Sequence, residues 1–165
     1  MRIGVVSDTH NNLKNVRRIV ELFNAADVQR VIHTGDISQA KTLDVLAGLS
    51  APLQGVFGNN DEERASLNVA ISAHNMKFVD PPLELRWHNR SILVVHDPLE
   101  LEGVHTDQQD LVLHGHTHRQ RIERREYGNK TQLIFNPGEC AGHMKGYNAI
   151  GIVDLETLEP EILNF

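Results

Sequence analysis

Seven side chains with the chemistry of metal ligands follow short apolar segments along this chain. They are two aspartates, one asparagine and four histidines: Asp8, His10, Asp36, Asn59, His96, His116 and His118. This mixture of imidazole and carboxylate donors favours Mn, Fe, Ni, Co or Zn over Mg or Ca. One divalent ion takes roughly four to six donors, so seven protein ligands exceed what a single open site needs. The set suits two ions that share a bridging carboxylate and leave positions for water.

The segments that precede these residues predict a parallel sheet. Apolar runs at 3–6, 28–32 and 53–57 read as buried strands. Between them, residues 16–23, 43–47 and 67–71 carry apolar side chains at helical spacing. Strands that alternate with helices predict a parallel sheet covered on its faces. Ligand sites in such sheets lie outside the carboxyl ends of the strands, so we expect the seven side chains to converge there.

The second half of the chain is richer in strands. After Pro81-Pro82 we expect strands at 83–87, 91–95, 110–113, 122–126, 132–135, 149–153 and 162–163, with a hairpin turn at 127–130. There is no internal repeat, low-complexity tract or linker. We therefore predict one domain over residues 1–165, an α/β sandwich with helices outside the strands.

Composition excludes several classes of protein. The 165 residues carry a net charge of −6, which argues against a broad nucleic-acid-binding surface. One cysteine, Cys140, cannot form an intramolecular disulfide and favours a reducing compartment. The longest apolar runs, such as 92–95, are far too short to cross a bilayer, and no signal-peptide pattern precedes Asp8. We expect a cytoplasmic protein that does not contact membranes.

The order of the motifs resembles a known family. Asp8-x-His10, Gly35-Asp36, Gly58-Asn59, His96 and 115–118 (Gly-His-Thr-His) together resemble the signature of the calcineurin-like metallophosphoesterase superfamily. The short chain, 58–61 (Gly-Asn-Asn-Asp) and 136–138 (Asn-Pro-Gly) resemble its compact bacterial and archaeal phosphodiesterase branch. The resemblance implies a β-sandwich of two mixed sheets flanked by helices, with a dinuclear metal site at the carboxyl ends of the strands.

The resemblance also implies a role for each ligand. One ion would take Asp8, His10 and His118, the other would take Asn59, His96 and His116, and Asp36 would bridge them. A hydroxide bridging the two ions would attack phosphorus. Manganese is the expected metal, with Ni, Co, Fe or Zn as alternatives. Asp36, Asn59 and Asn60 are then the catalytic candidates, and Asn11 and Asn60 are the candidates for binding substrate.

Three positions depart from the family pattern. Many members have a histidine at the position of Asn60, which contacts phosphate or protonates the leaving group. An amide cannot donate a proton as a general acid, so phosphodiesters, especially activated aryl ones, are favoured over monoesters. Asp97 stands where glycine usually follows the ligand His96. Glu139 replaces a common serine, and it is either a partner of a ligand histidine or an exposed loop acid.

Other polar residues receive less specific interpretations. We expect His33 to be hydrogen-bonded in the core and His114 to support the site, while His74, His88 and His105 lie on the surface. His143 is expected in a surface loop, with contact to substrate as the alternative. The arginines of 119–125 fit a solvated hairpin face better than a phosphate-steering patch. Cys140 fits a packed core residue, and Asn11 and Asn12 are expected to cap the first helix.

The sequence therefore predicts a metal-dependent phosphodiesterase that acts on a small phosphodiester. Two alternatives remain. The first is a non-catalytic protein-interaction scaffold of the same fold, as in the retromer-subunit relatives, although a scaffold has no reason to keep all seven ligands. The second is a phosphomonoesterase, against which Asn60 and the short chain both speak. The resemblance also leaves self-association into a homo-oligomer open.

Overall fold

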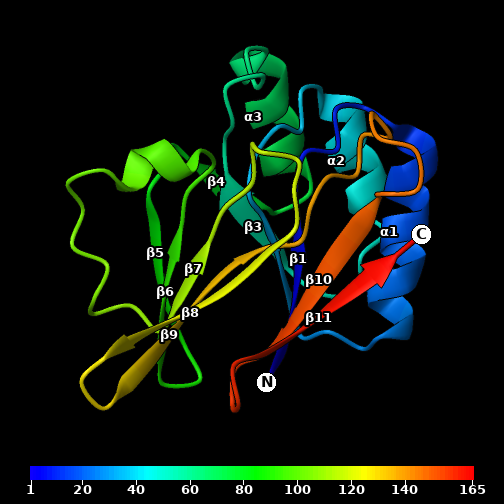
Figure 1. Cartoon of the computed structure of the whole chain (residues 1–165). Helices are drawn as coiled ribbons and strands as arrows, with labels where there is room; N and C mark the ends of the chain where they lie inside the picture. The colour runs from blue at the N-terminus through cyan, green and yellow to red at the C-terminus, as the bar shows by residue number, and fades with distance from the viewer.

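The chain folds into two packed β-sheets with helices against one of them (Figure 1). The computed structural model describes residues 1–165. The six-stranded sheet, in the order β11-β10-β1-β2-β3-β4, contains β1 (Arg2–Val6), β2 (Arg30–His33), β3 (Leu53–Val56), β4 (Lys77–Val79), β10 (Ala149–Asp154) and β11 (Glu159–Asn164). The five-stranded sheet, in the order β5-β6-β7-β9-β8, contains β5 (Leu83–Trp87), β6 (Arg90–Val94), β7 (Leu111–Leu113), β8 (Arg121–Tyr127) and β9 (Lys130–Asn136).

Both sheets are mixed, as expected. In the first sheet β1, β2, β3 and β4 run parallel, while β10 and β11 join antiparallel. In the second sheet β6, β7 and β9 run parallel between two antiparallel edge strands, β5 and β8. The chain passes from one sheet to the other at Pro81-Pro82, where the sequence pattern changes. The predicted sandwich of two mixed sheets is therefore confirmed.

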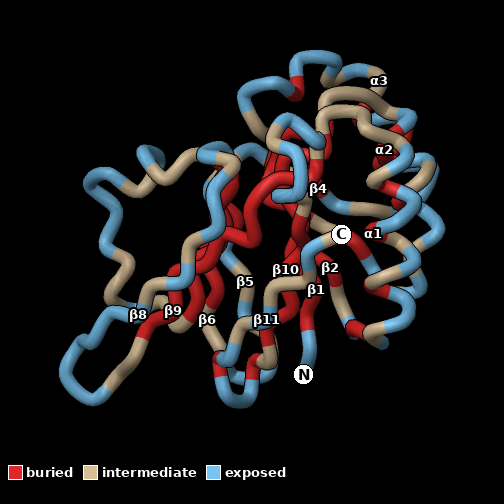
Figure 2. The backbone as a smooth tube through the Cα atoms, turned by 45° about the vertical axis from the view of Figure 1, so that its right-hand side comes forward, coloured by how far each residue is buried: buried red, intermediate tan, exposed pale blue.

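The core follows from the alternation of side chains along the strands. Ile3 and Val5 of β1 point between the sheets, where they pack with residues such as Ile92 and Leu111. The opposite face of β1 meets the helices, and Phe23 lies so close that a Cβ at Gly4 would be 2.6 Å from its ring. Figure 2 shows the buried residues running along the strands in both sheets.

The helices lie outside the strands, as expected, and they cover one of the two sheets. The helices α1 (Leu13–Ala25), α2 (Ala40–Leu46) and α3 (Arg64–Ala73) pack on the outer face of the six-stranded sheet. The outer face of the five-stranded sheet presents Leu93, Val112 and Ile134 to Leu101 of the 3-10 helix η1 (Pro98–Leu101). The parallel crossover from β6 to β7 is made through this short element. No helix is long and apolar enough to cross a membrane.

Two strand predictions need correction. The edge strand β4 was not predicted, because three residues that directly follow a helix give no readable alternation. The last strand, predicted at 162–163, extends over Glu159–Asn164 despite Pro160. This is allowed because β11 is an edge strand, where a residue without an N–H can face solvent.

Candidate metal centre

The carboxyl ends of β1, β2, β3, β6 and β7 come together at one side of the sandwich. Backbone hydrogen bonds join the loops after β1 and β2, from Asp8 N to Gly35 O (3.0 Å) and from His10 N to Asp36 O (3.1 Å). The imidazole Nδ1 of His96, after β6, lies 2.8 Å from the carbonyl oxygen of Thr34, after β2. This contact links the two sheets, so ligands from both halves of the chain face one region.

The backbone turns sharply at most of the ligand positions. Five of the seven candidate ligands have a positive φ, which non-glycine residues rarely adopt. They are Asp8 (53°), His10 (38°), Asp36 (62°), His116 (63°) and His118 (57°). Such conformations cost of order 1–3 kcal/mol each and cluster at functional sites. Here the turns direct side chains from the strand ends into one cluster.

The first ligand set, Asp8, His10 and His118, gathers around one carboxylate oxygen. Asp8 Oδ1 lies 3.3 Å from His118 Nε2 and 3.8 Å from His10 Nε2. The second carboxylate oxygen of Asp8 is already occupied, because it accepts hydrogen bonds from the Ser7 hydroxyl and from His116 N (3.1 Å). The free oxygen of Asp8 therefore faces the two imidazoles.

The second ligand set, Asn59, His96 and His116, gathers around an amide oxygen. Asn59 Oδ1 lies 3.0 Å from His96 Nε2 and 3.0 Å from His116 Nδ1. The two imidazole nitrogens are 3.3 Å apart. On its other side, His116 Nε2 lies 3.4 Å from Asp97 Oδ2, so the acid that replaces glycine faces the back of a candidate ligand.

Asp36 lies between the two sets. Its Oδ2 is 3.3 Å from His10 Nε2 and its Oδ1 is 3.5 Å from His96 Nε2. Asn60 donates to both oxygens, through its backbone N–H (2.9 Å) and its side-chain amide (2.7 Å). The carboxylate is almost fully buried and has one oxygen within 3.5 Å of an imidazole from each set.

A buried aspartate that the sequence analysis did not assign, Asp61, organises these loops. Its carboxylate accepts hydrogen bonds from Asp36 N (3.0 Å), Gly58 N (2.7 Å) and Ser38 N (2.6 Å). Gly58 itself has no space for a side chain, because an added Cβ would overlap Asp36 Oδ1. The only sign of this role in the sequence is that an acid directly follows Asn59 and Asn60. The motif 58–61 was interpreted mainly for its candidate ligand, Asn59.

The donor set fits divalent cations. Asp8 Oδ1 and His10 Nε2 are buried side-chain atoms without a hydrogen-bond partner. Buried polar atoms that lack a partner are rare and need a physical explanation. An acceptor oxygen and an imidazole nitrogen that face one another without a hydrogen bond are both satisfied by a cation between them. Asp8, His10 and Asp36 also place one ligand atom each within 4.8 Å of the other two.

Without a cation, the same groups form ion pairs. Burial lowers the pKa of His96, but the hydrogen bond and charge of Asp36 outweigh it and raise the pKa to about 9. Burial of Asp36 acts against its ionisation, yet His96 and Asn60 hold the pKa of this carboxyl well below its usual range. The Asp8 carboxylate, 3.3 Å from His118 Nε2, raises the pKa of His118. An ion bound by His96 would therefore have to displace the proton of this imidazole.

His33 and His114 are confirmed as buried supporting residues. His33 Nδ1 accepts a hydrogen bond from Gly35 N (3.1 Å), and its Nε2 lies 3.2 Å from the Thr9 hydroxyl. His114 Nδ1 lies 3.1 Å from Gly115 O. Both rings are buried, and neither belongs to a group of convergent ligand atoms.

The burial of His33 predicts an acid-sensitive fold. Burial lowers the pKa of His33 to about 4, whereas the unfolded chain binds this proton near pH 6.5. Between these values the unfolded state holds more protons, so His33 lowers the free energy of unfolding as pH falls, by up to about 1.4 kcal/mol per pH unit. When metal-free protein is denatured chemically at pH values from 7 to 4.5, the free energy of unfolding should decline less steeply in His33→Asn than in the unaltered protein. An identical pH slope in both proteins would contradict the prediction.

The remaining polar residues divide into confirmed and corrected expectations. Cys140 is fully buried and packed, and burial raises the pKa of its thiol. The hairpin arginines form surface ion pairs: Arg121 and Arg125 with Glu123, and Arg124 with Glu159. Asn12 caps α1 by accepting from Asn15 N, as expected. Asn11 does not cap α1, because its side-chain oxygen accepts instead from the Thr42 hydroxyl (3.1 Å).

The structure separates the alternatives left open for two loop residues. Glu139 is completely buried and not an exposed loop acid. His143 is exposed in its loop, as expected, yet its ring centroid lies 5.2 Å from that of His10 and 5.4 Å from that of His118. The loop after β9 thus reaches the first ligand set. No local pattern revealed this, because loop path depends on tertiary contacts.

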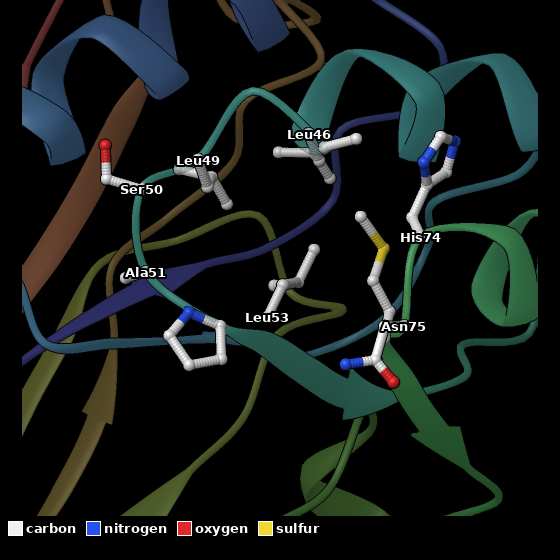
Figure 3. A pocket seen from close by; sticks show the side chains of 10 residues that line it. Leu46, Leu49, Ser50, Ala51, Leu53, His74 and Asn75 are labelled. Atoms are coloured by element: carbon white, nitrogen blue, oxygen red, sulfur yellow. The ribbon is translucent and has the colours of Figure 1, made fainter.

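Two surface pockets differ in their distance from these residues. One pocket, of about 240 Å³, is lined by Leu46, Leu49, Leu53 and His74, whose side chains Figure 3 shows. It lies at the amino end of β3, away from the ligand sets. The other pocket, about 280 Å³, is lined by the second ligand set together with Phe57, Gly58, Arg64, Pro81, Asp97 and Glu100. It offers space for a substrate group directly beside the candidate ligands.

Comparison with known proteins agrees with this geometry. The family model described as a calcineurin-like phosphoesterase superfamily domain matches residues 1–158. Phosphodiesterase MJ0936 of Methanocaldococcus jannaschii is 33% identical over 164 residues, covering 96% of either chain. The solved structure of an archaeal phosphodiesterase has a TM-score of 0.86 at 31% identity and covers 100% of both chains. The phosphoesterase YfcE of E. coli shares the fold, with a TM-score of 0.73 at 20% identity, covering 99% of this chain and 98% of that one.

Proposed function

We propose that this chain, which belongs to the calcineurin-like phosphoesterase superfamily, hydrolyses phosphodiesters with two divalent transition-metal ions held between its ligand sets. The observation that carries the proposal is the position of Asp36, within 3.5 Å of an imidazole from each set. A buried carboxylate between two groups of donors is the arrangement that joins two ions. The similarity to proteins named as phosphodiesterases supports the choice of substrate.

In this proposal the first ligand set holds one ion, the second set holds the other, and Asp36 bridges them. Two such ions supply a water of lowered pKa and neutralise charge on the phosphoryl group. Manganese is our first choice, and Ni, Co, Fe and Zn fit the same imidazole-rich donors. The pocket beside the second set has room for one substituent of the ester, at the lower end of ligand-pocket sizes.

Asn60 decides which esters react well. Its side-chain amide donates to Asp36 Oδ2, and it can also donate to a phosphoryl oxygen, but it has no proton to give a leaving alkoxide. The reaction therefore depends on a leaving group that departs as a stable anion. Aryl phosphodiesters meet this condition. We assign substrate contact to Asn60 and to Asn11, which directly follows His10 in the chain.

The test of this function compares two classes of ester on metal-loaded protein. We expect turnover of bis(p-nitrophenyl) phosphate to exceed that of p-nitrophenyl phosphate. Asn60→His restores a proton donor and should raise monoester turnover relative to diester turnover at least ~10-fold, below the ~10²–10⁴ of an optimised general acid. Asn129→His, on the exposed hairpin turn, is the control and should leave the ratio unchanged.

Two results would separate the alternatives. Preference for the monoester in the unaltered protein would establish a phosphomonoesterase instead. Absence of turnover on both esters, despite two bound ions per chain, would favour the interaction scaffold. The complete ligand set argues against that second outcome, because an interaction surface gains nothing from buried donors that lack hydrogen-bond partners.

A further inference from the structure

We propose that His143 is an additional protein ligand of the ion bound by the first ligand set, and that Glu139 holds it in place. The inference rests on the proposed function only in requiring a divalent ion beside Asp8, His10 and His118. His143 does not belong to the motifs that identify the family, and Glu139 stands at a position where this chain departs from the family pattern.

The geometry brings three imidazoles to one point. His10, His118 and His143 each place one ring nitrogen within 4.8 Å of the nitrogens of the other two. Three nitrogens bound to one ion at ~2.1 Å lie roughly 3.0–3.6 Å apart. The three nitrogens therefore need to approach one another by up to roughly 1–2 Å to share an ion, which rotation of the side chains can supply.

The loop that carries His143 is anchored at its start. Asn12, at the beginning of α1, donates to Ala141 O (2.7 Å), and Asn15 donates to Cys140 O (2.8 Å). The backbone N–H of Cys140 donates to Asp8 O (3.2 Å), which ties this loop to the first ligand set itself. The path of the chain into the site is thus fixed by buried and partly buried contacts before it reaches His143.

Glu139 closes the same loop from inside. Its side chain is fully buried, and its Oε1 accepts a hydrogen bond from Met144 N (2.8 Å), five residues along the chain. A buried carboxylate is costly unless it forms such a bond, so this contact is a built feature of the loop. It curls residues 139–144 so that His143, one residue before Met144, lies over His10 and His118.

The consequence is an asymmetric pair of metal sites. Counting Asp36 for both ions, the first ion would have five protein ligands, Asp8, His10, Asp36, His118 and His143. The second ion would have four, Asn59, His96, Asp36 and His116. More protein donors and one more imidazole make the first site the tighter one for transition metals. His143, being exposed, would close the site at its solvent side.

The experiment measures binding of Mn²⁺ and Co²⁺ to full-length protein stripped of metal, by equilibrium dialysis against a competing chelator. We expect His143→Ala to weaken the tighter of two sites by about 10–100-fold, and to leave the weaker site unchanged. The Co²⁺ absorption spectrum of the tighter site should change as a nitrogen ligand is lost. His105→Ala, an exposed loop histidine, is the matched control and should bind both ions normally.

Variants of Glu139 test the positioning role. Glu139→Gln keeps an acceptor for Met144 N and should retain the affinity of the unaltered protein. Glu139→Leu removes the acceptor and should weaken the same site as His143→Ala, in protein whose circular dichroism confirms folding. Unchanged affinities and an unchanged Co²⁺ spectrum in His143→Ala would overturn the inference while leaving the proposed function intact. Failure of the unaltered protein to bind any ion would instead overturn the proposed function.

Discussion

Asp36→Asn is expected to lower turnover of an aryl phosphodiester at least ~10²-fold and to loosen both metal ions. Loss of a residue that merely supports a metal ligand already costs 10–100-fold in affinity or activity, and a bridging ligand acts on two ions at once. The amide that replaces the carboxylate is neutral, so it can no longer hold two divalent cations close together.

The distances explain why one substitution should affect both sites. Asp36 Oδ2 lies 3.3 Å from His10 of the first set, and Oδ1 lies 3.5 Å from His96 of the second. No other carboxylate in the cluster faces both sets. The variant keeps the size of the side chain, and Asp61 can still accept from the backbone N–H of residue 36, so the loops should keep their path.

Metal content and turnover of Asp36→Asn are measured on the same preparation. Asp44→Asn is the control, because Asp44 pairs with His74 on the surface of the helical side. The control should bind two ions and turn over normally. Two ions per chain with full turnover in Asp36→Asn would show that this carboxylate does not bridge.

Removal of metal is expected to abolish turnover, and addition of Mn²⁺, Ni²⁺ or Co²⁺ to restore it. Without ions the cluster holds carboxylates and imidazoles in ion pairs, with the pKa of His96 raised to about 9 by Asp36 after burial has opposed it. None of these groups can supply a strong nucleophile to phosphorus. The measurement is turnover of bis(p-nitrophenyl) phosphate after dialysis against a chelator, with and without added metal.

The same experiment has a pH signature. Because Asp36 raises the pKa of His96 to about 9 against the effect of burial, binding of an ion to His96 should release a proton and grow stronger as pH rises toward 9. Metal should also raise the melting temperature, since an ion that binds only the folded state adds RT ln(1 + [L]/Kd) to its stability. Turnover that survives complete removal of metal would refute a metal-dependent reaction.

The strand ends could be predicted from sequence because each one combines two independent signals. An apolar run such as 3–6 gives the strand, and the polar residue just beyond it, Asp8, gives the ligand. Parallel strands must bring their carboxyl ends to one edge, so convergence follows from topology alone. The structure brings all seven candidate residues into one cluster, in which each contacts at least one of the others.

What sequence reasoning missed depends on contacts between distant segments. The edge strand β4 has only three residues, Lys77–Val79, and it is defined by pairing with β3 and not by a pattern of its own. Burial of Glu139 depends on the path of a loop with glycines at 138, 142 and 146. Asp61 accepts from three backbone donors in two loops, after β2 and after β3, a role that no local pattern encodes.

Anomalous diffraction from a crystal soaked in Mn²⁺ tests directly whether two ions bind with Asp36 between them. We expect two peaks ~3.5–4 Å apart, one beside Asp8, His10 and His118, the other beside Asn59, His96 and His116, and both within bonding distance of Asp36. A single peak, or two peaks that Asp36 does not join, would contradict the account.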